Sequence, residues 1–131
     1  MEIRRRVLVI DDERPIRGFL KNLLDRWGYE VEEASDGGQA LKRLKEGSFD
    51  LLILDIVMPV MDGWEVLKTV KSNLKMDVPV IVLSGKSDES NDMVKGYDMG
   101  AGYYITKPFT PSQLLYGIRM VFGEVETYWK A

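Results

Sequence analysis

Four short apolar runs in this sequence each lead into a polar residue of the kind that handles phosphate or a hard metal ion. The runs begin at Val7, Leu51, Val80 and Tyr103, and the polar residues that follow them are Asp11, Asp12, Asp55, Ser84 and Lys107. Runs of this length are typical of strands buried in a parallel sheet. Because such sheets bind ligands beyond the carboxyl ends of their strands, these polar groups are expected to converge.

The segments between the runs carry helical spacing. The clearest predicts a helix that starts near Pro15 and stops at Gly28, with one buried face: Ile16, Phe19, Leu20, Leu23, Leu24 and Trp27. A half-exposed edge strand is predicted over 29–33. Further helices are predicted from Asp36 to Gly47, from Asp62 with Trp64, Leu67, Val70 and Leu74 buried, and after Pro111 with Leu114, Leu115, Ile118, Val121 and Phe122 buried.

A helix over 90–99 has weak intrinsic propensity, since Gly96, Asn91 and two aspartates lie within it. Two explanations stay open at this point: the helix is an element that must move, or Gly96 allows close packing. Five strands alternating with five helices require right-handed crossovers over a parallel sheet. We therefore expect a doubly wound α/β fold, a (βα)5 three-layer sandwich.

The length of 131 residues predicts one domain, with a core over about 5–123 and a short C-terminal extension over 124–131 that leaves no room for an output domain. Charged residues make up 30% of the chain and the net charge is −3, so direct nucleic-acid binding is not expected. The one basic run, residues 4–6, is interpreted as a solvated strand start. The absence of a signal peptide and of a long apolar span predicts a cytoplasmic protein without membrane insertion.

The sequence contains no cysteine and no histidine. This excludes disulfides, Ser-His catalysis, histidine-ligated zinc and a phosphohistidine of the chain's own, so any phosphoryl group must come from another molecule.

Asp11, Asp12 and Asp55 would share one acidic pocket if their strands are neighbours. Two carboxylates about 4 Å apart repel by roughly 4 kcal/mol at an effective dielectric constant of ~20, so the pocket needs positive charge from Lys107 and a divalent cation. Oxygen ligands alone favour Mg²⁺, with Mn²⁺ as a substitute, and the candidate ligands are Asp12, Asp55 and the backbone carbonyl of Val57. Asp55 ends the most apolar run and is the candidate nucleophile toward phosphorus.

Each of these residues has a simpler structural interpretation. An aspartate after a strand is commonly a helix N-cap, a serine there a turn residue, and a Lys-Pro pair surface. Their occurrence together at successive strand ends is what favours a functional site.

With these residues at its strand ends, the chain resembles the receiver domains of two-component response regulators, including the single-domain chemotaxis regulators. Four motifs carry the resemblance, which covers nearly the whole chain: Asp11-Asp12-Glu13, the segment 55–63, Leu83-Ser84-Gly85 and Lys107-Pro108-Phe109. The resemblance implies a flavodoxin-like sheet with strand order 2-1-3-4-5.

The same resemblance implies roles for individual residues. Asp55 would be the phosphoacceptor, Asp12 a direct Mg²⁺ ligand, Asp11 a ligand acting through water, and Val57 a ligand through its carbonyl. Ser84 and Lys107 would contact the phosphoryl group, and the peptide before Pro108 would be cis. Alternation alone leaves Tyr103 and Tyr104 open as the switch aromatic, and the resemblance selects Tyr104.

The implied function is a switch rather than a turnover enzyme. The chain would catalyse its own phosphorylation from the phosphohistidine of a sensor kinase or a histidine phosphotransfer protein, followed by slow dephosphorylation. The surface of the fourth helix, fifth strand and fifth helix would then change its binding to a downstream protein. Val57 and Lys86 stand where relatives position hydrolytic water, so we expect a comparatively long-lived aspartyl phosphate.

Three other functions fit part of the pattern. A haloacid-dehalogenase-type phosphatase also uses a nucleophilic aspartate, but it needs a second aspartate where this chain has Val57. An FMN carrier needs a Ser/Thr-rich loop after the first strand, which is absent here. A receiver-like interaction module could work without phosphorylation. The presence of the complete set of expected phosphorylation-site residues argues against this alternative: Asp12, Asp55, Ser84 and Lys107.

Overall fold

The computed structural model describes residues 4–58, 61–85 and 89–124. Over these residues five strands alternate with helices. The strands are β1 (Arg6–Ile10), β2 (Glu30–Ala34), β3 (Leu51–Asp55), β4 (Val80–Ser84) and β5 (Tyr103–Thr106). The helices are α1 (Arg14–Arg26), α2 (Gly37–Glu46), α3 (Gly63–Lys68) with the π-helical segment η1 (Thr69–Asn73), α4 (Glu89–Asp98) and α5 (Pro111–Val121).

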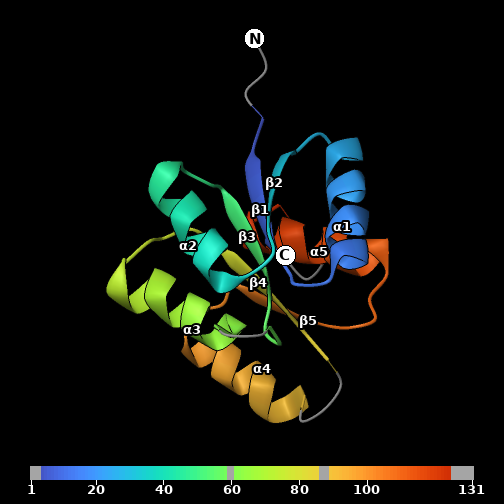
Figure 1. The fold of residues 1–131 in the computed structure, drawn as a ribbon. Helices are drawn as coiled ribbons and strands as arrows, with labels where there is room; N and C mark the ends of the chain where they lie inside the picture. Colours follow the sequence, from blue (N-terminus) through green and yellow to red (C-terminus); the bar gives the residue numbers. More distant parts are fainter. Residues whose placement is uncertain (1–3, 59–60, 86–88, 125–131) are drawn as a thin grey trace.

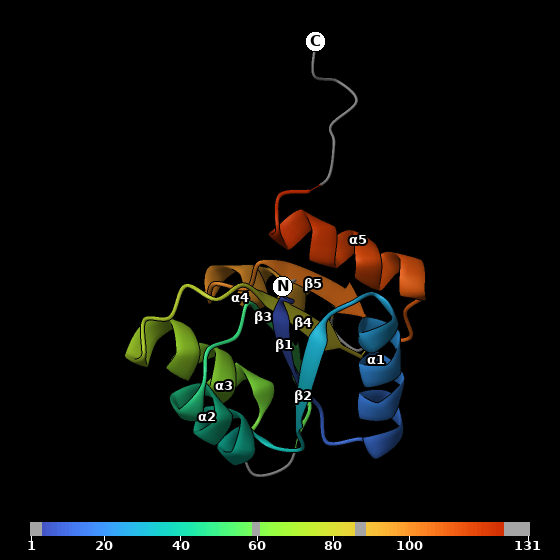
Figure 2. The same cartoon turned by 90° about the horizontal axis from the view of Figure 1, so that it is seen from above.

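All neighbouring strands are parallel, and the sheet order is β2-β1-β3-β4-β5. Figures 1 and 2 show α1 and α5 together on one face of the sheet and α2, α3 and α4 on the other. The predicted doubly wound fold and strand order are confirmed. Of the predicted C-terminal extension over 124–131, residues 125–131 lie outside the described residues. No helix in the described part of the chain is long and apolar enough to span a membrane.

The sheet separates two apolar cores, because successive strand residues point to opposite faces. On one face, Leu8, Ile10, Leu52 and Leu54 pack with side chains of α2, α3 and η1. On the other face, the alternate residues of the same strands pack with α1 and α5. β1, β3 and β4 are thus covered on both faces, which explains why their sequences read as continuous apolar runs.

Two of the predicted buried positions are exposed. Phe19 continues the apolar stripe of α1, but 46% of its surface is accessible, and its ring lies 6.5 Å from that of Phe109. Leu74 is 39% exposed because the predicted third helix changes type before it. The Leu74 amide bonds to the Thr69 carbonyl at 2.8 Å, the wider turn of a π-helix, and this shifts Leu74 out of the 3.6-residue stripe.

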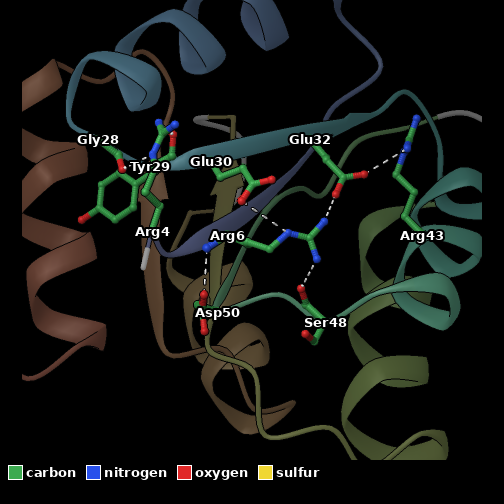
Figure 3. Close-up of polar contacts among 9 residues, drawn as sticks. All are labelled: Arg4, Arg6, Gly28, Tyr29, Glu30, Glu32, Arg43, Ser48 and Asp50. Carbon is green, nitrogen blue, oxygen red and sulfur yellow. Dashed lines mark hydrogen bonds and ion pairs between the residues drawn. The ribbon is translucent and has the colours of Figure 1, made fainter. Parts of the chain in front are cut away.

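The basic run at residues 4–6 is not simply solvated (Figure 3). Arg4 donates to the carbonyls of Gly28 and Tyr29. Arg6 bonds to the Ser48 carbonyl and pairs with Glu30 and Glu32 of the edge strand. These arginines therefore join the start of β1 to β2 and to the loop before β3. A sequence window shows only their charge, whereas their partners lie more than 20 residues away.

Gly96 in α4 has room for a side chain. A β-carbon there would lie 3.6 Å from Tyr104 and 3.8 Å from Trp64, which are ordinary contacts. We therefore expect Gly96→Ala to raise the free energy of unfolding by about 0.5–1 kcal/mol, since glycine weakens a helix by that amount. Urea denaturation measures the change. A loss of stability would instead mean that close packing at this position requires glycine.

Candidate phosphoacceptor and metal site

The register of the sheet brings the predicted polar residues to one end. Ile10 pairs with Leu54, so Asp11 and Asp55 follow at the same level on neighbouring strands. Asp55 in turn pairs with Leu83, and Ser84 pairs with Thr106. Parallel strands in this register therefore place Asp11, Asp55, Ser84 and Lys107 along one edge of the sheet.

The three aspartates form a single acidic cluster. Asp11 is fully buried, Asp55 is 3% exposed, and Asp12 lies on the surface. Each offers a carboxylate oxygen within 4.8 Å of the others. The cluster therefore reaches solvent through Asp12.

Lys107 bridges the two buried carboxylates. Its Nζ lies 3.0 Å from Asp11 Oδ2 and 3.2 Å from Asp55 Oδ1. Its backbone amide donates to the Ser84 carbonyl at 2.6 Å, which fixes the start of the loop after β5. The peptide bond between Lys107 and Pro108 is cis. One ammonium between two carboxylates leaves the cluster with excess negative charge.

This arrangement shifts the ionisation of both partners. Burial, followed by the nearby Asp11 carboxylate, raises the pKa of Asp55 to about 6 in spite of Lys107. Burial also acts to lower the pKa of the Lys107 ammonium, but the Asp55 and Asp11 carboxylates outweigh it and raise that pKa above its ordinary value. At neutral pH the pocket therefore holds ionised Asp55 beside a firmly protonated lysine.

Backbone amides donate to the two buried carboxylates, and an arginine side chain donates to the Asp11 backbone. Asp11 Oδ1 accepts from the Glu13 amide at 2.9 Å, and Asp55 Oδ1 accepts from the Val57 amide at 3.3 Å. Arg17 of α1 donates to the Asp11 carbonyl at 2.8 Å. Arg17 was not among the predicted site residues, although an arginine in the first turns of the helix after an aspartate pair could have indicated it.

Ser84 is buried at the end of β4, and its hydroxyl contacts Asp92 of α4, a residue that the sequence analysis also missed. Tyr104 is buried in β5 beside α4, whereas Tyr103 is half-buried against Gly117 of α5. The Val57 side chain is 71% exposed. Lys86, the other residue expected near hydrolytic water, lies outside the described residues.

The acidic cluster fits a hard divalent cation. Its donors are carboxylate oxygens, and both oxygens of Asp11 already accept from protein donors, the Glu13 amide and Lys107. Asp12 is therefore better placed than Asp11 to bind a cation directly. Few protein ligands and an open side are what Mg²⁺ prefers, since it keeps several water or phosphate ligands.

Comparison with known proteins places these features in a family. A sequence model of the response regulator receiver domain matches residues 7–119. The alkaline phosphatase synthesis transcriptional regulatory protein PhoP of Bacillus subtilis is 38% identical over 122 residues, which are 93% of this chain and 50% of PhoP. The transcriptional regulatory protein DltR of Streptococcus agalactiae is 42% identical over 115 residues, 88% of this chain and 50% of DltR. The chain thus spans about half the length of these curated relatives.

Two solved structures resemble this chain over most of its length. The Vibrio cholerae chemotaxis protein CheY4 superposes with a TM-score of 0.82 and 34% identity, covering 91% of this chain and 99% of CheY4. The receiver domain of Francisella response regulator 1452 superposes with a TM-score of 0.84 and 30% identity, covering 93% of this chain and 99% of that domain. Sequence identities of 30% and above support membership of the same family as well as a shared fold.

Proposed function

This chain belongs to the family of response regulator receiver domains, which are signalling switches, and from that premise we propose that it is switched by phosphorylation of Asp55. The observation that carries the proposal is the Lys107 ammonium held between the buried Asp11 and Asp55 carboxylates, beside the exposed Asp12. The same premise leaves the phosphatase and FMN-carrier functions without support.

The chemistry follows from the position of Asp55. Among the described residues, its contacts with Lys107 and the Val57 amide both reach Oδ1, which leaves Oδ2 as the oxygen to attack phosphorus. A new O–P bond forms as the N–P bond of a donor phosphohistidine breaks, and the released imidazole takes up a proton from water. Lys107 offsets the negative charge on the phosphoryl oxygens.

Asp12, Asp55 and the Val57 carbonyl would hold Mg²⁺ directly, with Asp11 acting through water. When bound, the ion neutralises charge on the phosphoryl oxygens and on the acidic cluster. Lys107 orients the acceptor carboxylate, and the buried walls of the pocket limit access by water. Mn²⁺ is expected to substitute because it accepts the same oxygen ligands.

The downstream response is proposed to run through Ser84 and Tyr104. Ser84 would bond to the phosphoryl group, and Tyr104 would repack beneath α4, whose Gly96 lies against it. The surface expected to change as a result is formed by α4, β5 and α5. Between β5 and α5 this face has a hollow of about 550 Å³, and it exposes large apolar side chains: Met93, Val94, Tyr97, Tyr116 and Met120. Such a face fits a protein partner rather than a nucleic acid.

The proposed partners are a sensor histidine kinase or a histidine phosphotransfer protein upstream and a target protein downstream. The donor histidine lies outside these 131 residues, because they contain no histidine. We further propose that residues 5–123 form one receiver domain and that it works in the cytoplasm.

Intact mass after incubation with acetyl phosphate tests the function. The parent chain should gain one phosphoryl group only with Mg²⁺, and Asp55→Ala should gain none. If the parent gains no phosphoryl group and also fails to bind beryllofluoride, the phosphorylation proposal is wrong and the phosphorylation-independent interaction module replaces it.

Asp12→Ala is expected to weaken the stabilisation by Mg²⁺. Binding to the folded state raises the melting temperature by mass action, by an amount equivalent to about 2.7 kcal/mol at a hundredfold excess over the dissociation constant. Melting curves with and without Mg²⁺ should show a smaller shift in Asp12→Ala than in the parent and in the exposed control Asp98→Ala. Equal shifts in all three would remove Asp12 from the metal site.

Val57→Asn is expected to shorten the lifetime of the aspartyl phosphate. An amide can hydrogen-bond the attacking water, whereas the exposed valine cannot, and one such bond of about 1 kcal/mol corresponds to a roughly fivefold faster decay. The decay is timed by mass spectrometry after removal of the donor. Val57→Leu is the apolar control, and a decay in Val57→Asn no faster than in this control contradicts the hypothesis.

A further inference from the structure

A side-chain contact joins the acceptor edge of the sheet to α4. Ser84 closes β4 and is 2% exposed. Its Oγ lies 3.3 Å from Oδ2 of Asp92, and it lies at the same distance from the carbonyl of Gly85. Asp92 is half-buried on α4. The contact therefore ties a strand-end hydroxyl to the helix that covers Tyr104.

The Ser84 hydroxyl carries a single proton. Ionised carboxylates and phosphoryl oxygens are acceptors only, so each of them needs that proton to form a hydrogen bond with Ser84. That proton can therefore serve only one of three acceptors at a time: Asp92, the Gly85 carbonyl or a phosphoryl group on Asp55. A bond to Asp92 thus competes with a bond to the phosphoryl group, and Asp92, as the ionised acceptor, is the stronger competitor of the two protein groups.

We propose that Asp92 is a positioning residue that holds Ser84 in the unphosphorylated state and is released when Ser84 bonds to the phosphoryl group. The inference rests on the proposed function, because it needs a phosphoryl group on Asp55. It adds a specific link: the state of the acceptor determines whether β4 holds α4 through this contact. Because the link stabilises the resting state, it lowers the affinity for any mimic of the phosphoryl group.

Beryllofluoride affinity measures the link. The mimic is titrated at saturating Mg²⁺, and its binding is followed by tryptophan fluorescence. A movement of α4 is expected to change the emission of Trp64, because Lys95 of α4 lies 4.4 Å from the centre of the Trp64 ring. Asp92→Ala should bind beryllofluoride roughly three- to tenfold more tightly than the parent, the range expected for loss of one competing hydrogen bond. Asp98→Ala removes the same charge from an exposed position on the same helix and should leave the affinity unchanged.

A double-mutant cycle separates this role from a merely structural one. In a Ser84→Ala background the Asp92→Ala change should no longer alter the affinity, because the hydroxyl that Asp92 holds is gone. Asp92→Asn keeps an acceptor oxygen and removes the charge, so its affinity should stay closer to that of the parent than to that of Asp92→Ala. Thermal melting of each variant checks that it folds.

Three outcomes would overturn the inference. These are an unchanged or weaker affinity in Asp92→Ala, the same gain in the Ser84→Ala background, or a gain in Asp92→Asn as large as that in Asp92→Ala, which would assign the effect to charge repulsion alone. If the parent itself does not bind beryllofluoride, the proposed function fails, and the inference fails with it. If the parent binds beryllofluoride and Asp92→Ala binds it with the same affinity, the inference fails while the proposed function stands.

Discussion

Asp55→Asn is expected to make the protein more stable at neutral pH, by about 2–3 kcal/mol in the free energy of unfolding. Burial and the neighbouring Asp11 raise the pKa of Asp55 from 3.8 to about 6. The folded state therefore holds this proton more tightly than the unfolded chain does. Ionising the side chain in the fold costs stability, and the full cost is present above pH 6. Asparagine has a similar shape without the charge, so it removes this cost.

The stability difference between Asp55→Asn and the parent is expected to depend on pH. As pH falls from about 6 to about 4, the parent takes up the proton in the folded state and gains stability, so its difference from Asp55→Asn should shrink toward zero. Urea denaturation at pH 7 and pH 4 in EDTA measures both values. Asp98→Asn, an exposed control, should show no such trend. An Asp55→Asn variant no more stable than the parent at pH 7 would mean that Lys107 fully compensates the buried charge.

Gly63→Ala is expected to destabilise the fold by about 3 kcal/mol and to disturb the acceptor. A β-carbon at position 63 would lie 2.3 Å from the Asp55 carbonyl oxygen and 2.6 Å from the Ile56 α-carbon. Both are backbone atoms, so no flexible side chain can move aside, and the strand end carrying Asp55 would have to shift. The Gly63 amide also donates to the Ile56 carbonyl at 2.8 Å, which fixes this close approach.

Gly18→Ala in α1 is the matched control. A β-carbon there meets nothing within 4 Å, so alanine should stabilise α1 by about 0.5–1 kcal/mol. The free energy of unfolding and the rate of phosphorylation by acetyl phosphate are measured for both variants. If Gly63→Ala proves as stable and as reactive as Gly18→Ala, the close approach does not constrain the acceptor.

Errors in the sequence analysis fall where distant contacts decide the local structure. Phe19 fits the apolar stripe of α1, but it is 46% exposed, and its ring lies beside that of Phe109, a residue 90 positions away in the sequence. The π-helical turn after Lys68 rotates Leu74 out of its stripe, and propensity rules for α-helices do not anticipate such a turn. The basic run at residues 4–6 finds its partners on β2 and in the loop before β3.

The sequence by itself determined the order of the elements, the doubly wound fold and the residues at the strand ends. These features depend on local periodicity and on the rule that parallel strands end at one edge of their sheet. Only the tertiary structure decided how those residues act on one another: Lys107 between Asp11 and Asp55, the raised pKa of Asp55, and Asp92 on the Ser84 hydroxyl. The physical reason is that burial, charge and hydrogen bonding depend on distances in space between residues far apart in the chain, and no sequence window contains those distances.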